Sequence, residues 1–352
     1  MNEALCSVVR TLAQAESEIL LLARSHPTNW QALTATLPER WTRGDRREPA
    51  FEFRRAPDFK CLRTDLAAAW RRASAQGPFG ELLARRATEL ESDAELAEQI
   101  GSAKFRAFAQ RRYALGDVNG ADELALSWCR LDAESESGPR VASDDWVHPL
   151  SLVNQLQTQM SNCGVSIPIR VDQRLAAVAT VDRDCVWVRA GEQLFACQAS
   201  RIALHEVHGH VLRRIAARQP ENYLSSSGFE LCDEDEEGRA IWLEETAGLL
   251  DSVRKAELGR RHLAASACLQ GAKFVETVEL LLSADAPLKQ ALNTALRVWR
   301  GGGLAREVIY LRAYLRVRSK LSNSQPLEEW MQRGRYSIDV AAKLATAELV
   351  LP

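Results

Sequence analysis

Apolar side chains recur at intervals of three and four residues along most of this chain, the spacing of a helix that buries one face. The pattern is clear from residue 1 to about 24, and it returns in several stretches between 62 and about 128 and again from Ala199 to Arg218. A further helix is expected from about Asp235 to Leu258, where Gly259 offers a stop. The sequence therefore predicts a mostly helical protein.

A different pattern begins near residue 165. The segment Ile167–Val171 is apolar and β-branched, and the segments Ala177–Val181 and Cys185–Arg189 alternate on either side of a polar turn at Asp182-Arg183-Asp184. Such alternation around a short polar turn is typical of a β-hairpin. We therefore expect an α+β fold, mostly helical, with one small antiparallel sheet next to the histidine-bearing helix at 199–218.

The domain organisation follows from these changes in pattern along 352 residues. We expect an N-terminal helical region at 1–130, a linker and helix at 131–164, and a catalytic region at 165–352. The linker is placed at Leu131–Trp146 because this stretch is rich in Asp, Glu, Ser and Gly. Residues 42–57 are polar and marked by prolines, which favours a loop or an edge strand.

The charge balance restricts the class of partner. The chain has 45 basic and 47 acidic residues, a net charge of −2, which gives no electrostatic reason to expect a nucleic acid. No apolar run is long enough for a transmembrane helix, and the first residues do not resemble a signal peptide, so no membrane partner is expected. The eight cysteines form no CxxC pair, which favours reduced thiols in a cytoplasm.

Three of the six histidines fall in one hexapeptide, His205-Glu206-Val207-His208-Gly209-His210. Histidine is the commonest zinc ligand, and zinc hydrolases place a carboxylate beside the metal. His205 and His210 are five residues apart, which separates them by about 140° on an ideal helix, but a π-bulge would align them and Gly209 lowers its cost. His205 and His208 lie only about 60° apart without any bulge, and spacing alone favours this second pair.

A third ligand must come from another segment, because catalytic zinc sites have three protein ligands. The acidic run Asp233-Glu234-Asp235-Glu236-Glu237 is the richest source, and it opens a predicted helix that also carries Glu244 and Glu245. Glu237 and Glu244 are seven residues apart and share a helix face. Acidic residues at a helix start also complement the helix dipole, so the run by itself does not identify a ligand.

The hexapeptide and the segment Glu237-Gly238-Arg239-Ala240, which begins 27 residues after His210, resemble the microtubule-associated tyrosine carboxypeptidase family. Its bacterial members are known as QEGLA-motif proteins, and the family pattern is HExxxH followed by Glu-Gly-x-Ala. The resemblance implies a Zn²⁺ cofactor held by His205, His210 and Glu237, with Glu206 as the general base. It thus implies the first histidine pair in place of the pair that spacing favours. The implied activity is removal of a C-terminal residue, with an aromatic preference, from a peptide or protein.

Weaker similarities to the family lie at Pro27–Trp30, Pro49–Phe51, Arg297–Gly302 and Val308–Leu311. The chain also departs from the family pattern. His208-Gly209 stands where Gly-Thr is usual, Arg239 stands at the Leu of QEGLA, and Ala216–Arg218 replaces an Asn-Gly before Gln219-Pro220. None of these departures removes a ligand or the base, but all lie close to where a substrate would bind.

A carboxypeptidase also needs a cation for the terminal carboxylate of its substrate, and Arg suits a bidentate contact. The candidates beside Gly301-Gly302-Gly303 are Arg300 first, then Arg297 and Arg306, with Tyr310 as a hydroxyl donor. An Arg at a helix C-terminus next to a glycine also has a purely structural use, because it complements the dipole.

Two other functions compete with a general carboxypeptidase. One is a maturation or tailoring peptidase for one dedicated peptide in a biosynthetic pathway. The other is a non-catalytic regulatory protein that binds the metal without turnover. The presence of Glu206 argues against the second, because a structural metal site has no use for a free carboxylate. The sequence does not indicate an oligomeric state.

Overall fold

A computed structural model describes residues 3–113, 120–131, 138–322 and 324–350. The chain divides into two compact units, one from residues 1–132 and 255–312 and the other from residues 133–254 and 313–351. We describe each unit by itself. The three-part division expected from the sequence stays a prediction, and its linker residues 132–137 lie outside the described residues.

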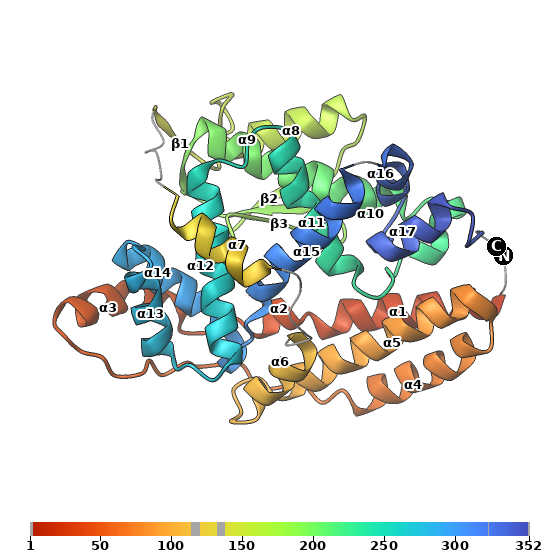
Figure 1. Cartoon of the computed structure of the whole chain (residues 1–352), viewed down its shortest axis with the longest axis horizontal. Helices are drawn as coiled ribbons and strands as arrows, with labels where there is room; N and C mark the ends of the chain where they lie inside the picture. Colours follow the sequence, from red (N-terminus) through yellow and green to blue (C-terminus); the bar gives the residue numbers. More distant parts are fainter. Residues whose placement is uncertain (1–2, 114–119, 132–137, 323, 351–352) are drawn as a thin grey trace. The chain divides into compact units, whose positions relative to one another are not determined.

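The first unit is helical. Its helices are α1 (Glu3–Ile19), α2 (Leu21–Arg24), α3 (Trp30–Thr42), α4 (Lys60–Ser74), α5 (Gly77–Glu98), α6 (Phe105–Tyr113), α7 (Ala121–Cys129), α13 (Phe274–Ser283), α14 (Leu288–Val298) and the 3₁₀ turns η3 (Arg300–Gly302) and η4 (Arg306–Val308). Helices α1, α4 and α5 pack along one another (Figure 1), and α1 buries Leu5, Val8 and Leu12 on one face, as the spacing predicts. Between α3 and α4 the chain has no regular element, which confirms a loop there and not an edge strand.

The prediction of one long helix at 235–258 is wrong. The structure has two helices here, α11 (Cys232–Thr246) and α12 (Ser252–Leu269), and the chain turns between them at Gly248, whose φ is 70°. Gly259 lies inside α12, where a Cβ would stand 2.7 Å from the carbonyl oxygen of Ala125 on α7. This glycine therefore serves close helix packing and not helix termination. Helices α12 and α15 (Ile309–Leu321) contribute residues to both units.

The second unit combines helices with two small sheets. Its other helices are α8 (Leu152–Asn162), α9 (Ala196–Leu204), the π-helix η1 (His205–Val211), α10 (Leu212–Ala216), the 3₁₀ helix η2 (Pro220–Ser225), α16 (Gln325–Gln332) and α17 (Ile338–Ala345). Its strands are β1 (Arg140–Ala142), β2 (Ile169–Val171), β3 (Ala179–Val181), β4 (Val186–Val188) and β5 (Gln193–Phe195). The α+β class, mostly helical, is confirmed.

The sheets differ in detail from the single antiparallel sheet that the sequence predicts. The expected hairpin is present, because β3 pairs antiparallel with β4 in the register Val181↔Val186. However, β4 is the central strand of three and pairs in parallel with β2, while β1 and β5 form a separate antiparallel pair. Val186 and Val188 are fully buried, so one face of this central strand lies against the core.

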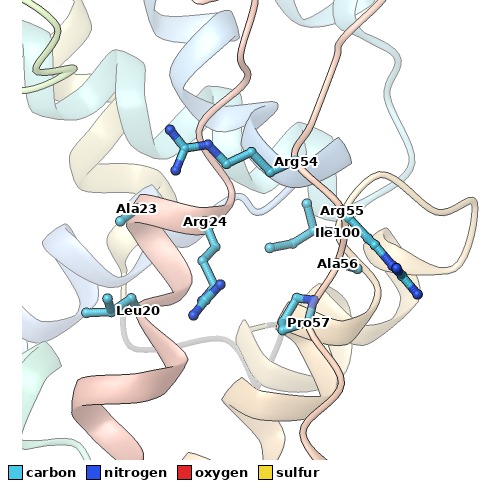
Figure 2. Close-up of a pocket in the computed structure, with 8 residues that line it drawn as sticks. All are labelled: Leu20, Ala23, Arg24, Arg54, Arg55, Ala56, Pro57 and Ile100. Atoms are coloured by element: carbon cyan, nitrogen blue, oxygen red, sulfur yellow. The ribbon is translucent and has the colours of Figure 1, made fainter.

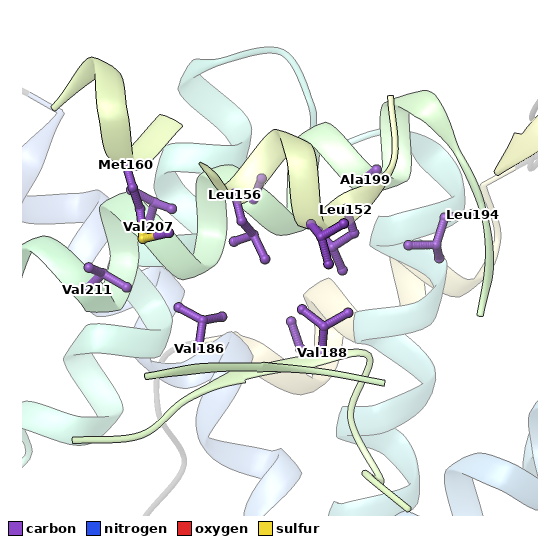
Figure 3. Close-up of a cluster of buried hydrophobic side chains, with 12 residues drawn as sticks. Leu152, Leu156, Met160, Val186, Val188, Leu194, Ala199, Val207 and Val211 are labelled. Atoms are coloured by element: carbon purple, nitrogen blue, oxygen red, sulfur yellow. The ribbon is translucent and has the colours of Figure 1, made fainter. Parts of the chain in front are cut away.

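The core of the second unit fixes the position of the π-helix. Figure 3 shows Leu152, Leu156 and Met160 of α8 and Val207 and Val211 of η1 above the sheet, with Val186 and Val188 of β4 pointing up toward them. The side chains of this cluster are all at most 7% exposed, so apolar packing of Val207 and Val211 holds η1 in place. No helix within the described ranges is long and apolar enough to cross a bilayer.

Candidate metal centre

The histidine hexapeptide adopts a π-helix. The chain runs from α9 through η1 to α10, and at the end of η1 the N–H of Leu212 donates to the carbonyl of Val207, five residues earlier. A π-helix brings residues five apart into line. The imidazole rings of His205 and His210 accordingly lie next to each other, with centroids 5.1 Å apart and planes inclined at 58°. Of the two pairs that the spacing allowed, the structure brings together His205 and His210.

Glu237 on α11 completes a group of three. Its Oε2 lies 3.5 Å from Nε2 of His205 and 3.9 Å from Nε2 of His210, and one ligand atom from each residue falls within 4.8 Å of the others. Ligands of a tetrahedral zinc ion stand roughly 3.4 Å apart, given metal–ligand bonds of about 2.0–2.1 Å. Two imidazoles and one carboxylate are also a known donor set for catalytic zinc. The residues therefore fit a zinc ion.

The other nitrogen of each ring contacts a second carboxylate. Nδ1 of His205 lies 2.7 Å from Oε1 of Glu244, and Nδ1 of His210 lies 2.6 Å from Oε1 of Glu236. Both glutamates come from α11 and are at most 2% exposed. The sequence pointed to the shared face of Glu237 and Glu244 but gave no sign of the role of Glu236.

The electrostatics of the group favour a positive charge. Burial lowers the pKa of His205, but its hydrogen bonds to Glu237 and Glu244 raise that pKa to about 9. For Glu244, burial acts in the opposite direction and raises the pKa. The charges of Arg254 and His205 outweigh burial and hold this pKa at about 2. In the absence of a metal a proton supplies the positive charge that these carboxylates stabilise, so a divalent cation would bind in competition with that proton.

Glu206 differs from the other glutamates of the site. It is 8% exposed, and no hydrogen bond engages its carboxylate among the residues that the structure describes. Burial raises its pKa and the charge of Glu237 adds to this effect, while His210 and His205 oppose it. A carboxylate beside the histidines with a raised pKa and no fixed partner is suited to accept and return a proton.

His208 and Arg239, two departures from the family pattern, contact each other. Nη1 of Arg239 donates to the backbone carbonyl of His208 at 2.8 Å, so the buried guanidinium supports the π-helix. The ring of His208 is directed to another partner, with Nε2 3.9 Å from Sγ of Cys163 on the C-terminal side of α8. Burial and the charge of Arg239 lower the pKa of His208. His208 is not part of the His205–His210–Glu237 group.

The predicted substrate-binding residues lie in the first unit, where they form their own network. Nε of Arg297 and Nη2 of Arg300 each lie 2.8 Å from Oε1 of Glu307, and the hydroxyl of Tyr310 is 3.5 Å from Nη2 of Arg297. The guanidinium of Arg306 lies over the ring of Tyr310 at 5.9 Å. Glu307, which no sequence pattern indicated, thus accepts hydrogen bonds from both arginines. Their predicted contact with a substrate carboxylate stays a prediction.

The first unit also has a cavity of about 220 Å³ whose lining includes Arg24, Arg54 and Arg55. Figure 2 shows the three guanidinium groups pointing in different directions, with that of Arg55 directed away from the other two. Arg24 donates to the carbonyl oxygens of Glu18 and Ile19. These arginines do not converge on one point as a carboxylate-binding site requires.

Two histidines and a glutamate are a donor set that metal-dependent hydrolases use, and π-helical turns are frequent at functional sites. A family model described as microtubule-associated tyrosine carboxypeptidase matches residues 41–348, which is most of the chain. The chain therefore belongs to the microtubule-associated tyrosine carboxypeptidase family, as the motif resemblance predicted. This is a family of carboxypeptidases, which implies a peptide or protein substrate. No curated protein matches the chain.

Proposed function

We propose that this protein is a zinc-dependent carboxypeptidase in which His205, His210 and Glu237 hold the metal and Glu206 transfers protons. The convergence of the two Nε2 atoms on Oε2 of Glu237 carries the proposal. Family membership supports the class of reaction. The removal of an aromatic C-terminal residue is part of the proposal, since the family is described by tyrosine removal.

The residues around the site divide the chemistry between them. Zinc would supply Lewis acidity toward a peptide carbonyl and toward water. Glu206 accepts a proton from the attacking water and donates it to the amine that leaves. General acid–base catalysis of this kind contributes about 10²- to 10⁴-fold to the rate. Its buried setting supports both steps, because a raised pKa brings the carboxyl group closer to the operating pH.

The proposal is tested by incubating the zinc-loaded protein with a library of peptides that differ at the C-terminus and following the products by mass spectrometry. A carboxypeptidase releases one terminal residue, and peptides with an amidated C-terminus serve as matched substrates that it does not cleave. Internal cleavage, or equal cleavage of free and amidated peptides, would reject exopeptidase action. Tight zinc binding with no cleavage of any peptide would instead support the non-catalytic alternative.

A further inference from the structure

We propose that Glu244 and Glu236 are positioning residues that fix the rings of His205 and His210 with Nε2 toward the metal. This inference rests on the proposed zinc site and adds two residues to it. Neither glutamate is placed to bind the metal itself, because each contacts the nitrogen on the opposite side of its histidine ring. The two carboxylates act through the histidines.

The hydrogen bonds determine which ring nitrogen carries the proton. An ionised carboxylate can only accept, and a neutral imidazole has one N–H. The contacts of 2.7 and 2.6 Å from Nδ1 to the glutamates therefore require the proton on Nδ1 in each metal-binding histidine. The lone pair is then left on Nε2, the atom that faces Glu237. Both rings are thus prepared to bind a cation in the same tautomer.

Arginines hold the two carboxylates in turn. Nε and Nη2 of Arg254 lie 3.1 and 3.2 Å from the two oxygens of Glu244, and Nη1 of Arg201 lies 3.6 Å from Oε2. Glu236 is flanked by Nη1 of Arg213 at 3.8 Å and by Nε of Arg214 at 3.7 Å. Positive charge behind each glutamate keeps it an acceptor and restricts its rotation. A carboxylate that accepts a hydrogen bond from a ligating imidazole raises the basicity of that imidazole.

One helix carries the whole arrangement. Glu236, Glu237 and Glu244 all belong to α11, and a spacing of seven residues returns to nearly the same helix face. Docking of α11 on η1 thus sets the third ligand and both positioning residues at once. Outer-shell partners of this kind typically contribute 10- to 100-fold to metal affinity.

The test compares zinc affinity in Glu236→Gln, Glu244→Gln and the control Asp235→Asn, using competition with a chromophoric chelator on protein shown to be folded by circular dichroism. Gln keeps the shape of Glu but removes its charge. Asp235 is a matched control because it is 1% exposed on the same helix and contacts Arg316 and the N–H of Ile338 but no histidine. We expect the two glutamine variants to lose about 10- to 100-fold in affinity and the control to match the wild type.

Removal of the Glu244 charge weakens a buried ion pair with Arg254, so this variant can fail to fold. Glu236→Gln then decides the question, since Arg213 retains the carbonyl oxygens of Gly334 and Tyr336 as acceptors. Long-range ¹H–¹⁵N spectra of the zinc-loaded wild type give an independent measurement of which ring nitrogen is protonated. A merely structural role of the two glutamates would not fix that nitrogen. Both ligating rings should be protonated at Nδ1 and metallated at Nε2.

The outcomes separate this inference from the proposed function. A wild-type protein that binds no zinc overturns the proposed function and this inference with it. Tight zinc binding by the wild type together with unchanged affinity in Glu236→Gln, or a ring metallated at Nδ1, overturns the inference alone. Equal losses in the Asp235→Asn control would show a general effect of buried charge on α11 and would also overturn it.

Discussion

Gly209 faces Ala240 so closely that a Cβ added to Gly209 would stand 2.7 Å from the Cβ of Ala240. Gly209 precedes the proposed ligand His210 on η1, and Ala240 follows Glu237 by one helical turn on α11. The absence of a side chain at Gly209 therefore lets the two ligand-bearing helices approach each other. This is a packing reason for a glycine that the sequence suggested only as a relief for the π-helix.

Gly209→Ala should destabilise the protein by about 1–3 kcal/mol, the usual cost of forcing an extra methyl group into a packed contact. It should also weaken zinc binding, because η1 and α11 must move apart. The double variant Gly209→Ala/Ala240→Gly removes the clash and should return to within about 1 kcal/mol of the wild type, the cost of a helical glycine. Urea unfolding and zinc titration measure both effects. A single variant as stable as the wild type would contradict the close approach.

Substitution of the proposed ligands should remove the metal. His205→Ala, His210→Ala and Glu237→Ala each delete one of three donors, so each should lose stoichiometric zinc and peptide cleavage together. His208→Ala is the matched control from the same turn, because its ring is directed to Cys163, and it should keep one zinc per chain. Metal analysis after dialysis measures the content. Loss of zinc in His208→Ala with retention in His210→Ala would restore the pair that spacing alone favours.

Glu206→Gln should separate metal binding from catalysis. Gln fills the same space and Glu206 makes no hydrogen bond within the described part of the chain, so fold and zinc content should be unchanged. Proton transfer is lost, and kcat should fall by about 10²- to 10⁴-fold with little change in KM. Steady-state cleavage of the best peptide from the library gives both constants. An unchanged kcat would exclude Glu206 as the proton carrier.

The sequence predicted what depends on local patterns. Apolar spacing in α1 and alternation around the turn between β3 and β4 each reflect which face of a single element is buried, so both could be read directly. The group of His205, His210 and Glu237 could not be predicted from local patterns alone. The spacing of the three histidines allowed two pairs, His205 with His210 or His205 with His208, and the π-helix brings the first pair together.

The rest depended on contacts between distant segments. The acidic run at the start of α11 has the pattern of any helix N-terminus, and the docking of α11 on η1 determines that Glu236 and Glu237 are the members that meet His210. The sequence predicts a helix stop at Gly259. The contact that explains this glycine is with Ala125, which is too far away in the sequence for a local pattern to show it. Likewise, the engagement of Arg300 by Glu307 depends on the turn through Gly301–Gly303, whose conformation a sequence pattern does not give.

A pH dependence of stability should arise at His26 in the first unit. Burial, aided by the charge of Arg300, lowers the pKa of His26 from 6.5 to about 4, and its Nδ1 is buried without a hydrogen-bond partner in the described residues. Between these two pH values the unfolded chain binds more protons, so stability is full above pH 6.5 and falls as the pH drops to 4. Because the ring is partly exposed, we expect a loss of about 1–2 kcal/mol from this group. His26→Phe keeps the packing on Trp30, so its unfolding midpoint in urea should fall less over this range than that of the wild type. Parallel curves for the two proteins would show that His26 does not titrate as its surroundings require.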